Sequence, residues 1–104
     1  MSKHALVVED QAEIRDLIRF TLEMGGFEVS EAPDGQAAMA IADQKSFDIV
    51  LLDVMMPGGL DGLAVCQRLK ADRRHRRTKV VMLSARGQSA DLQAGRQVGA
   101  DRYL

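Results

Sequence analysis

The stretch that decides the fold is Phe47-Asp48-Ile49-Val50-Leu51-Leu52-Asp53-Val54-Met55-Met56-Pro57, where an apolar run leads straight into a carboxylate and then breaks. Ile49 to Leu52 are apolar without alternation, which is typical of a short strand buried on both faces of a parallel sheet. Pro57 and the two glycines after it stop the strand. Asp53 is therefore expected at the carboxyl end of a central strand, the edge where open α/β sheets bind ligands.

Apolar runs and helical patterns alternate along the rest of the chain. Strands are expected at residues 5–8, 27–30, 49–52 and 80–83, and a fifth begins at residue 102. Helices are expected at residues 11–24, after Pro33-Asp34-Gly35, after a capping Asp61, and at residues 89–98. Right-handed crossovers fold such a series into a parallel sheet covered by helices on both faces. We expect an α/β fold with a flavodoxin-like, doubly wound parallel sheet in the strand order 2-1-3-4-5.

Size and composition limit the kinds of function. The 104 residues, 46% hydrophobic and 28% charged, suit one small domain over residues 1–104. The formal net charge of -1 provides no overall field that would attract nucleic acid or an acidic membrane. The single cysteine, Cys66, excludes an internal disulfide, and no signal peptide or long apolar run is evident. We therefore expect a cytoplasmic protein that acts through a local site.

Three carboxylates follow two of the predicted strands. Glu9 and Asp10 come directly after residues 5–8, and Asp53 comes directly after residues 49–52. In the expected strand order these two strands are neighbours, so the three side chains meet in one crevice. Carboxylates at short range repel unless they are protonated or a cation holds them together, and oxygen ligands without His or Cys favour Mg²⁺. This pattern predicts phosphoryl chemistry, with Asp53 as the nucleophile and Ser84 donating a hydrogen bond to a phosphoryl oxygen.

The motifs occur in a recognisable order: Glu9-Asp10, Asp53 with Met56-Pro57-Gly58 and Asp61-Gly62, Leu83-Ser84-Ala85, and Gly99-Ala100-Asp101 with Tyr103. Together they resemble the receiver domain of bacterial two-component response regulators. The resemblance covers essentially the whole chain. Met55 and Arg86 look most like the subgroup of regulators that carries a winged-helix DNA-binding domain.

The resemblance implies a phosphorylation-dependent signalling switch. Asp53 would accept a phosphoryl group from a sensor histidine kinase or a phosphotransfer protein. Ser84 would move toward that group, and Tyr103 would rotate inward behind it. The implied Mg²⁺ site consists of Glu9, Asp10, Asp53 and the backbone carbonyl of Met55. Such a protein phosphorylates and dephosphorylates itself and is not a turnover enzyme.

The resemblance also implies partners. Pairing with a kinase would lie largely on the first helix, with candidate contacts at Ile14, Arg15, Ile18 and Leu22. Neither direct nucleic acid binding nor membrane contact by this chain is expected.

Two features depart from the family pattern. The loop Gly58-Gly59-Leu60-Asp61 has one residue more than usual, a surface change that such loops tolerate. The chain also ends at Leu104, before the Lys-Pro and the last helix of family members. In the family that lysine pairs with the phosphoryl group. Without the helix, apolar side chains of the first and third strands are expected to be uncovered, which favours self-association, for example as a homodimer. We expect a fragment of a longer regulator.

Simpler interpretations stand beside several of these assignments. Asp10 with Glu13 fits a helix capping box, Ser84 can satisfy a turn, and Tyr103 can serve packing alone. The basic run from Arg73 to Arg77 is interpreted as a solvated loop, and Cys66 as a core residue.

Two other functions compete with the switch. An aspartate-nucleophile phosphohydrolase usually carries a second Asp two residues after the nucleophile as general acid, but Met55 occupies that position. A receiver-like interaction module that is never phosphorylated would explain the absent lysine, but the complete acidic set argues against it.

Overall fold

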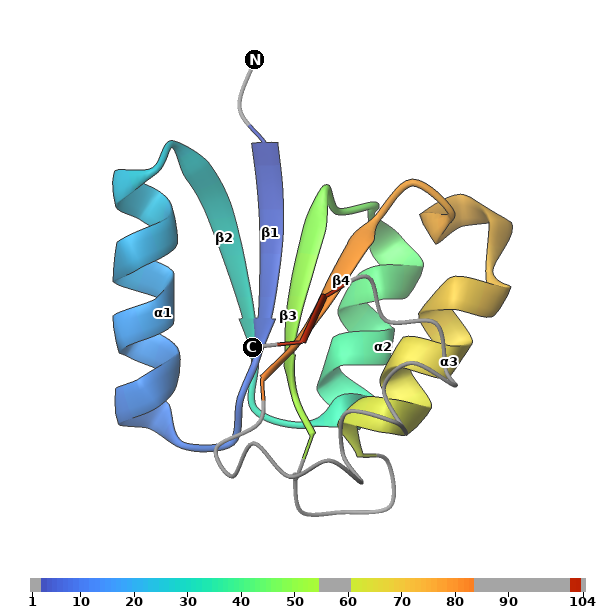
Figure 1. Cartoon of the computed structure of the whole chain (residues 1–104), viewed down its shortest axis with the longest axis horizontal. Coiled ribbons are helices and arrows are strands. Elements are labelled where there is room, and N and C mark those ends of the chain that lie inside the picture. The colour runs from blue at the N-terminus through green and yellow to red at the C-terminus, as the bar shows by residue number, and fades with distance from the viewer. Residues whose placement is uncertain (1–2, 55–60, 84–101, 104) are drawn as a thin grey trace.

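The computed structural model describes residues 3–54, 61–83 and 102–103. Its five strands form one parallel sheet in the order β2-β1-β3-β4-β5, as predicted. The strands are β1 (Lys3–Val8), β2 (Phe27–Ala32), β3 (Ile49–Asp53), β4 (Lys79–Leu83) and β5 (Arg102–Tyr103). The described helices are α1 (Ala12–Met24), α2 (Gly35–Gln44), α3 (Gly62–Ala71) and the short 3-10 helix η1 (Arg73–His75). Helix α1 covers one face of the sheet, and α2 and α3 cover the other (Figure 1). The helix predicted at residues 89–98 lies outside the described residues.

The register of the sheet brings two strand ends together. Val8 of β1 pairs with Leu52 of β3, so the residues that follow them leave the sheet side by side. On its other edge β3 pairs with β4, with Asp53 opposite Leu83. The carboxyl ends of β1, β3 and β4 therefore meet at one edge of the sheet.

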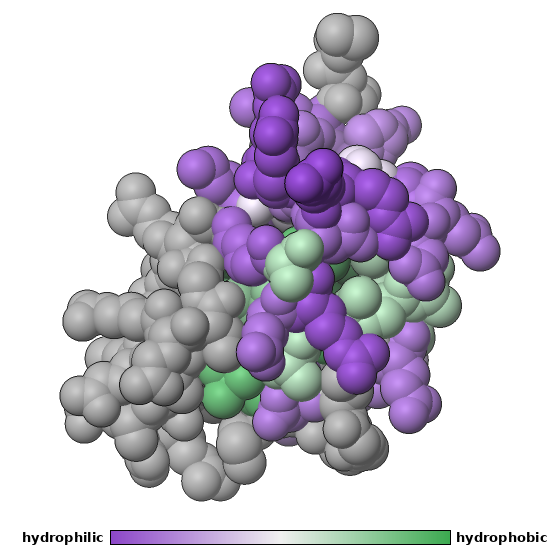
Figure 2. Space-filling model, turned by 90° about the vertical axis from the view of Figure 1, so that its right-hand side faces the viewer, coloured by the Kyte–Doolittle hydropathy of each residue, from purple (hydrophilic) through white to green (hydrophobic). Residues whose placement is uncertain are grey.

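The hydrophobic core lies between the sheet and the helices α2 and α3. Val65, Cys66 and Leu69 of α3 are buried in it, which confirms the predicted core face of that helix and the interpretation of Cys66 as a core residue. The strands contribute alternate residues, Leu6, Val8, Val50, Leu52, Val80 and Met82. Seen from the side of α2 and α3, the described surface is largely hydrophilic (Figure 2).

On the opposite face the expected exposure of strand side chains is wrong for β1, whose Ala5 and Val7 are fully buried, whereas Ile49 and Leu51 of β3 are half-buried. The helix on this face is itself less buried than α2 and α3. Helix α1 has no buried residue, although its sequence carries a predicted apolar stripe. Ile18 and Leu22 of that stripe are half-buried, whereas Ile14 and Leu17 are exposed. With Phe20 and Met24 they form a row of large apolar side chains that are between 43% and 76% exposed.

Helix caps support one prediction and correct another. The Asp61 carboxylate accepts a hydrogen bond from the Ala64 N–H at 2.9 Å, so Asp61 caps α3 as expected. Helix α1 has Gln11 as its N-cap, without a side-chain cap hydrogen bond. The capping-box interpretation of Asp10 with Glu13 is therefore wrong, because α1 begins one residue after the position that this interpretation requires.

The basic run is solvated at its four arginines, as predicted, but it differs from expectation in forming a helical turn and in burying His75. Arg73 to His75 form η1, and the His75 side chain is buried rather than solvated. Arg74 forms ion pairs with Asp72 at 2.7 Å and Asp43 at 2.9 Å, which anchor the turn to the ends of α3 and α2. Among the residues that the structure describes, no helix is long and apolar enough to span a membrane.

Candidate functional site

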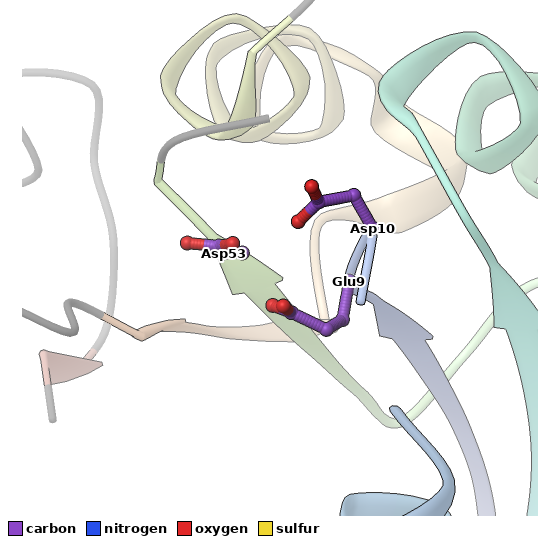
Figure 3. Close-up of side chains that lie close together, drawn as sticks. All are labelled: Glu9, Asp10 and Asp53. Carbon is purple, nitrogen blue, oxygen red and sulfur yellow. The ribbon is translucent and has the colours of Figure 1, made fainter. Parts of the chain in front are cut away.

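Three carboxylates converge where β1 and β3 end. Glu9 and Asp10 directly follow β1, and Asp53 is the last residue of β3. One carboxylate oxygen from each residue lies within 4.8 Å of those from the other two. Figure 3 shows the three side chains pointing toward a common space. The strand order predicted this convergence.

Burial makes this cluster electrostatically unusual. Glu9 is only 4% exposed, whereas Asp10 and Asp53 are half-buried. The pKa of Glu9 is raised from 4.5 to about 7. Burial is the largest cause, and the hydrogen bond with Asp53 and the charge of Asp53 act in the same direction. The Gln11 N–H, 3.4 Å from Glu9 Oε1, opposes the shift. Burial and the neighbouring Asp53 therefore favour the protonated form of Glu9 when no cation is bound.

The donor set fits a hard divalent cation. Each residue offers carboxylate oxygens, and Mg²⁺ is bound by such oxygens together with water and phosphate. A bound cation would offset the repulsion among the three carboxylates and favour the ionised form of Glu9, which burial disfavours. The residues present are thus compatible with Mg²⁺ and with a phosphoryl ligand beside it.

The end of β3 is fixed from two sides. The Val54 N–H donates to the Leu83 carbonyl at 3.2 Å, and the Gly62 N–H donates to the Val54 carbonyl at 3.2 Å. A Cβ atom on Gly62 would overlap the Asp53 carbonyl oxygen and lie 2.9 Å from its carbon. Glycine is therefore required where α3 meets the strand that carries Asp53. In the sequence Gly62 was recognised only as part of a motif. Its position directly after the capping residue Asp61 was the one feature that could have indicated a close backbone contact at the start of α3.

Sequence reasoning also missed the part played by Arg15. Its Nη1 donates to the backbone carbonyl of Glu9 at 2.8 Å, and its Nε lies 3.7 Å from Glu31 Oε1. The sequence indicated Arg15 only as a candidate kinase contact. No pattern in the sequence signals the contact with Glu9, because it depends on how α1 packs beside β1 and β2.

The sequence matches the response regulator receiver domain family over residues 5–104. The chain belongs to this family. Among its relatives, the dual master transcriptional regulator RpaA of Synechocystis is 43% identical over 95% of the chain and 41% of RpaA. The phosphate regulon regulator PhoB of Escherichia coli is 41% identical over 100% of the chain and 45% of PhoB. The chain thus spans less than half the length of these relatives.

Solved receiver domains have the same architecture. The chemotaxis protein CheY4 of Vibrio cholerae superposes with a TM-score of 0.93 at 31% identity, covering 100% of this receiver domain and 86% of CheY4. NtrX of Brucella abortus gives a TM-score of 0.89 at 32% identity, covering 100% of this chain and 23% of NtrX. The predicted family is thereby confirmed.

The structure does not describe the side chains of the other predicted site residues of this receiver domain. Met55 and Ser84 lie outside the described residues. Tyr103 lies in β5, where its backbone pairs with Met82, but its side chain is not described. Their roles stay predictions.

Proposed function

We propose that this receiver domain is a phosphorylation-dependent switch of a two-component system, which accepts a phosphoryl group on Asp53 from a histidine kinase or phosphotransfer protein. The observation that carries the proposal is the position of Asp53 at the ligand edge of the sheet, beside Glu9 and Asp10. Membership of the receiver family supports it. The relatives RpaA and PhoB, named as transcriptional regulators, support a role in signalling for the longer proteins.

In the proposed reaction an Asp53 carboxylate oxygen attacks the phosphorus atom of the donor. A new oxygen–phosphorus bond forms, and the phosphorus–nitrogen bond of a phosphohistidine breaks, with its electron pair leaving on the imidazole. Glu9, Asp10, Asp53 and the Met55 carbonyl would hold Mg²⁺, which when bound neutralises negative charge on the transferring group. Glu9, whose pKa is raised by burial and by Asp53, would bind the cation in its ionised form.

The later steps belong to residues at the ends of β4 and β5. Ser84 would donate a hydrogen bond to a phosphoryl oxygen and move toward it. Tyr103 would follow by rotating inward and so change the surface near β5. This is signalling by one stoichiometric transfer, so the domain is proposed not to be a turnover enzyme.

The kinase is proposed to dock on α1. Ile14 is exposed there, and Leu17, Phe20 and Met24 extend the same apolar surface. Burial of such side chains is a usual source of binding free energy at protein interfaces. A cytoplasmic location is part of the same proposal and rests on the family.

Mass spectrometry of the intact protein tests the proposal. After incubation with acetyl phosphate and Mg²⁺, the wild type is expected to gain one phosphoryl group, whereas Asp53→Asn and a sample treated with EDTA gain none. Equal labelling of Asp53→Asn would overturn the assignment of Asp53. Steady release of phosphate from added esters would favour the phosphohydrolase, and a folded protein without labelling would favour the interaction module.

A further inference from the structure

Both backbone groups of Glu9 are hydrogen-bonded, the N–H to β2 and the carbonyl to a side chain of α1. Its N–H donates to the carbonyl of Ala32, the last residue of β2, at 3.1 Å. Its carbonyl accepts from Arg15 Nη1 at 2.8 Å. Glu9 lies beyond the last paired residue of β1, so this carbonyl has no strand partner and would be costly to leave unpaired in a buried position.

Arg15 is itself held on β2. Its Nε lies 3.7 Å from Glu31 Oε1, and Arg19 Nε lies 3.5 Å from the same oxygen. That oxygen is buried and has no hydrogen-bond partner among the described residues, so the two guanidinium charges provide its compensation. The Arg15 side chain is 20% exposed and that of Arg19 is 36% exposed. Arg15 thus directs one nitrogen to Glu9 and another to Glu31.

We propose that Arg15 is a positioning residue that fixes the start of the β1–α1 connection, and with it the carboxylates of Glu9 and Asp10, in the geometry that binds a divalent cation. The inference rests on the proposed Mg²⁺ site. It assigns to Arg15 a function within the domain that is separate from contact with a kinase.

The charge of Arg15 and its hydrogen bond to Glu9 predict opposite changes in Mg²⁺ affinity when Arg15 is replaced. A guanidinium beside an acidic site repels Mg²⁺, so loss of the Arg15 charge alone would strengthen Mg²⁺ binding. Loss of the hydrogen bond to Glu9 frees the connection that carries two ligands and weakens Mg²⁺ binding. Weaker Mg²⁺ binding after loss of Arg15 therefore indicates a positioning role, and tighter binding indicates a general electrostatic effect. A residue that only contacts the kinase would leave Mg²⁺ affinity unchanged.

Arg19 provides the matched control. It lies one helical turn after Arg15 on α1 and approaches the same Glu31 oxygen, but its other ion pairs are with Asp16 and Glu23 rather than with the acidic site. Arg19→Ala removes an equal charge and a similar ion pair from the same helix. Only Arg15→Ala removes the hydrogen bond to the Glu9 carbonyl.

The experiment is a Mg²⁺ titration at constant ionic strength, followed by the backbone amide resonances of Glu9, Asp10 and Asp53 in two-dimensional NMR. Arg15→Ala is expected to weaken Mg²⁺ binding about tenfold, the lower end of the effect of residues that orient metal ligands, while Arg19→Ala stays close to wild type. The cation-free spectrum of each variant reports whether it is folded. If Arg15→Ala is unfolded, Arg15→Lys, which can reach only one of the two partners, is judged by the same criterion.

Two results would overturn the inference in distinguishable ways. Wild-type protein without Mg²⁺-dependent shifts at these amides would overturn the proposed cation site and the role of Arg15 together. Clear shifts in the wild type, with an affinity in the folded Arg15 variant equal to or tighter than that of Arg19→Ala, would overturn only the role of Arg15.

Discussion

Gly62 and Asp53 touch through their backbones. The first residue of α3 packs so closely on the last residue of β3 that a Cβ atom on Gly62 would overlap the Asp53 carbonyl oxygen and lie 3.0 Å from Val54 Cα. The position of the proposed phosphoacceptor is therefore coupled to where α3 begins. A backbone contact of this kind cannot relax by rotation of a side chain.

Gly62→Ala is expected to displace the end of β3 and slow phosphorylation of Asp53. Overpacking at such a contact costs about 1–3 kcal/mol of unfolding free energy. Urea denaturation and the rate of labelling by acetyl phosphate measure the two effects. Gly25→Ala is the control, because a Cβ atom there meets no atom closer than 3.4 Å. Equal stability and equal labelling rates for the two variants would contradict the coupling.

The raised pKa of Glu9 predicts how stability depends on pH. Because the Glu9 pKa is about 7 in the folded chain and 4.5 ordinarily, the folded state binds the extra proton between these values. Its stabilising contribution is present below about pH 4.5 and is lost as pH rises through 7, with a total of at most ~3 kcal/mol. Denaturation in EDTA at pH 5 and pH 8 should therefore show wild type losing more stability than Glu9→Gln. An equal loss of stability between pH 5 and pH 8 in both proteins would refute the raised pKa of Glu9.

Asp10 separates the two interpretations of the acidic start of α1. Since Gln11 is the N-cap and no side chain caps α1, Asp10→Ala should cost no stability without Mg²⁺ and should weaken the stabilisation that Mg²⁺ provides. A capping residue behaves differently: Asp61→Ala, at the true cap of α3, is expected to cost about 1 kcal/mol. Thermal unfolding with and without Mg²⁺ compares them. An equal loss of unfolding free energy for both variants in EDTA would show that Asp10 caps α1 after all.

Thr78 is expected to matter more for stability than the neighbouring Arg74. Its buried hydroxyl donates to the Phe47 carbonyl at 2.6 Å, so Thr78→Val leaves a buried acceptor unpaired and should cost about 1–3 kcal/mol. The Arg74 ion pairs lie on exposed side chains and are screened by salt. Arg74→Ala should therefore destabilise less, and less still in high salt. Denaturation of both variants at two salt concentrations decides this order.

The sheet and the acidic cluster could be predicted because they depend on local pattern. Unbroken apolar runs marked β1, β3 and β4, and the acids directly after β1 and β3 had to share one sheet edge once the strand order was given. The core face of α3 followed from helical spacing, because one side of that helix packs fully on the sheet.

What could not be predicted depends on long side chains and on where a helix starts. The start of α1 at Ala12 decides whether Asp10 caps the helix or faces the cluster, and a shift of one residue lies within the uncertainty of sequence patterns. The contact of Arg15 with Glu9 spans β1 and α1 and has no sequence signature. His75 is buried although it stands among arginines, because η1 turns its side chain away from the solvent.

We propose that Asp53 carries the phosphoryl group. The most direct test is borohydride reduction of protein treated with acetyl phosphate and Mg²⁺, followed by peptide sequencing in the mass spectrometer. Hydride reduces an aspartyl phosphate to homoserine with release of phosphate, so homoserine at position 53 alone is the predicted result. Homoserine at another aspartate, or no homoserine in protein that has gained a phosphoryl group, would show that Asp53 is not the phosphoacceptor.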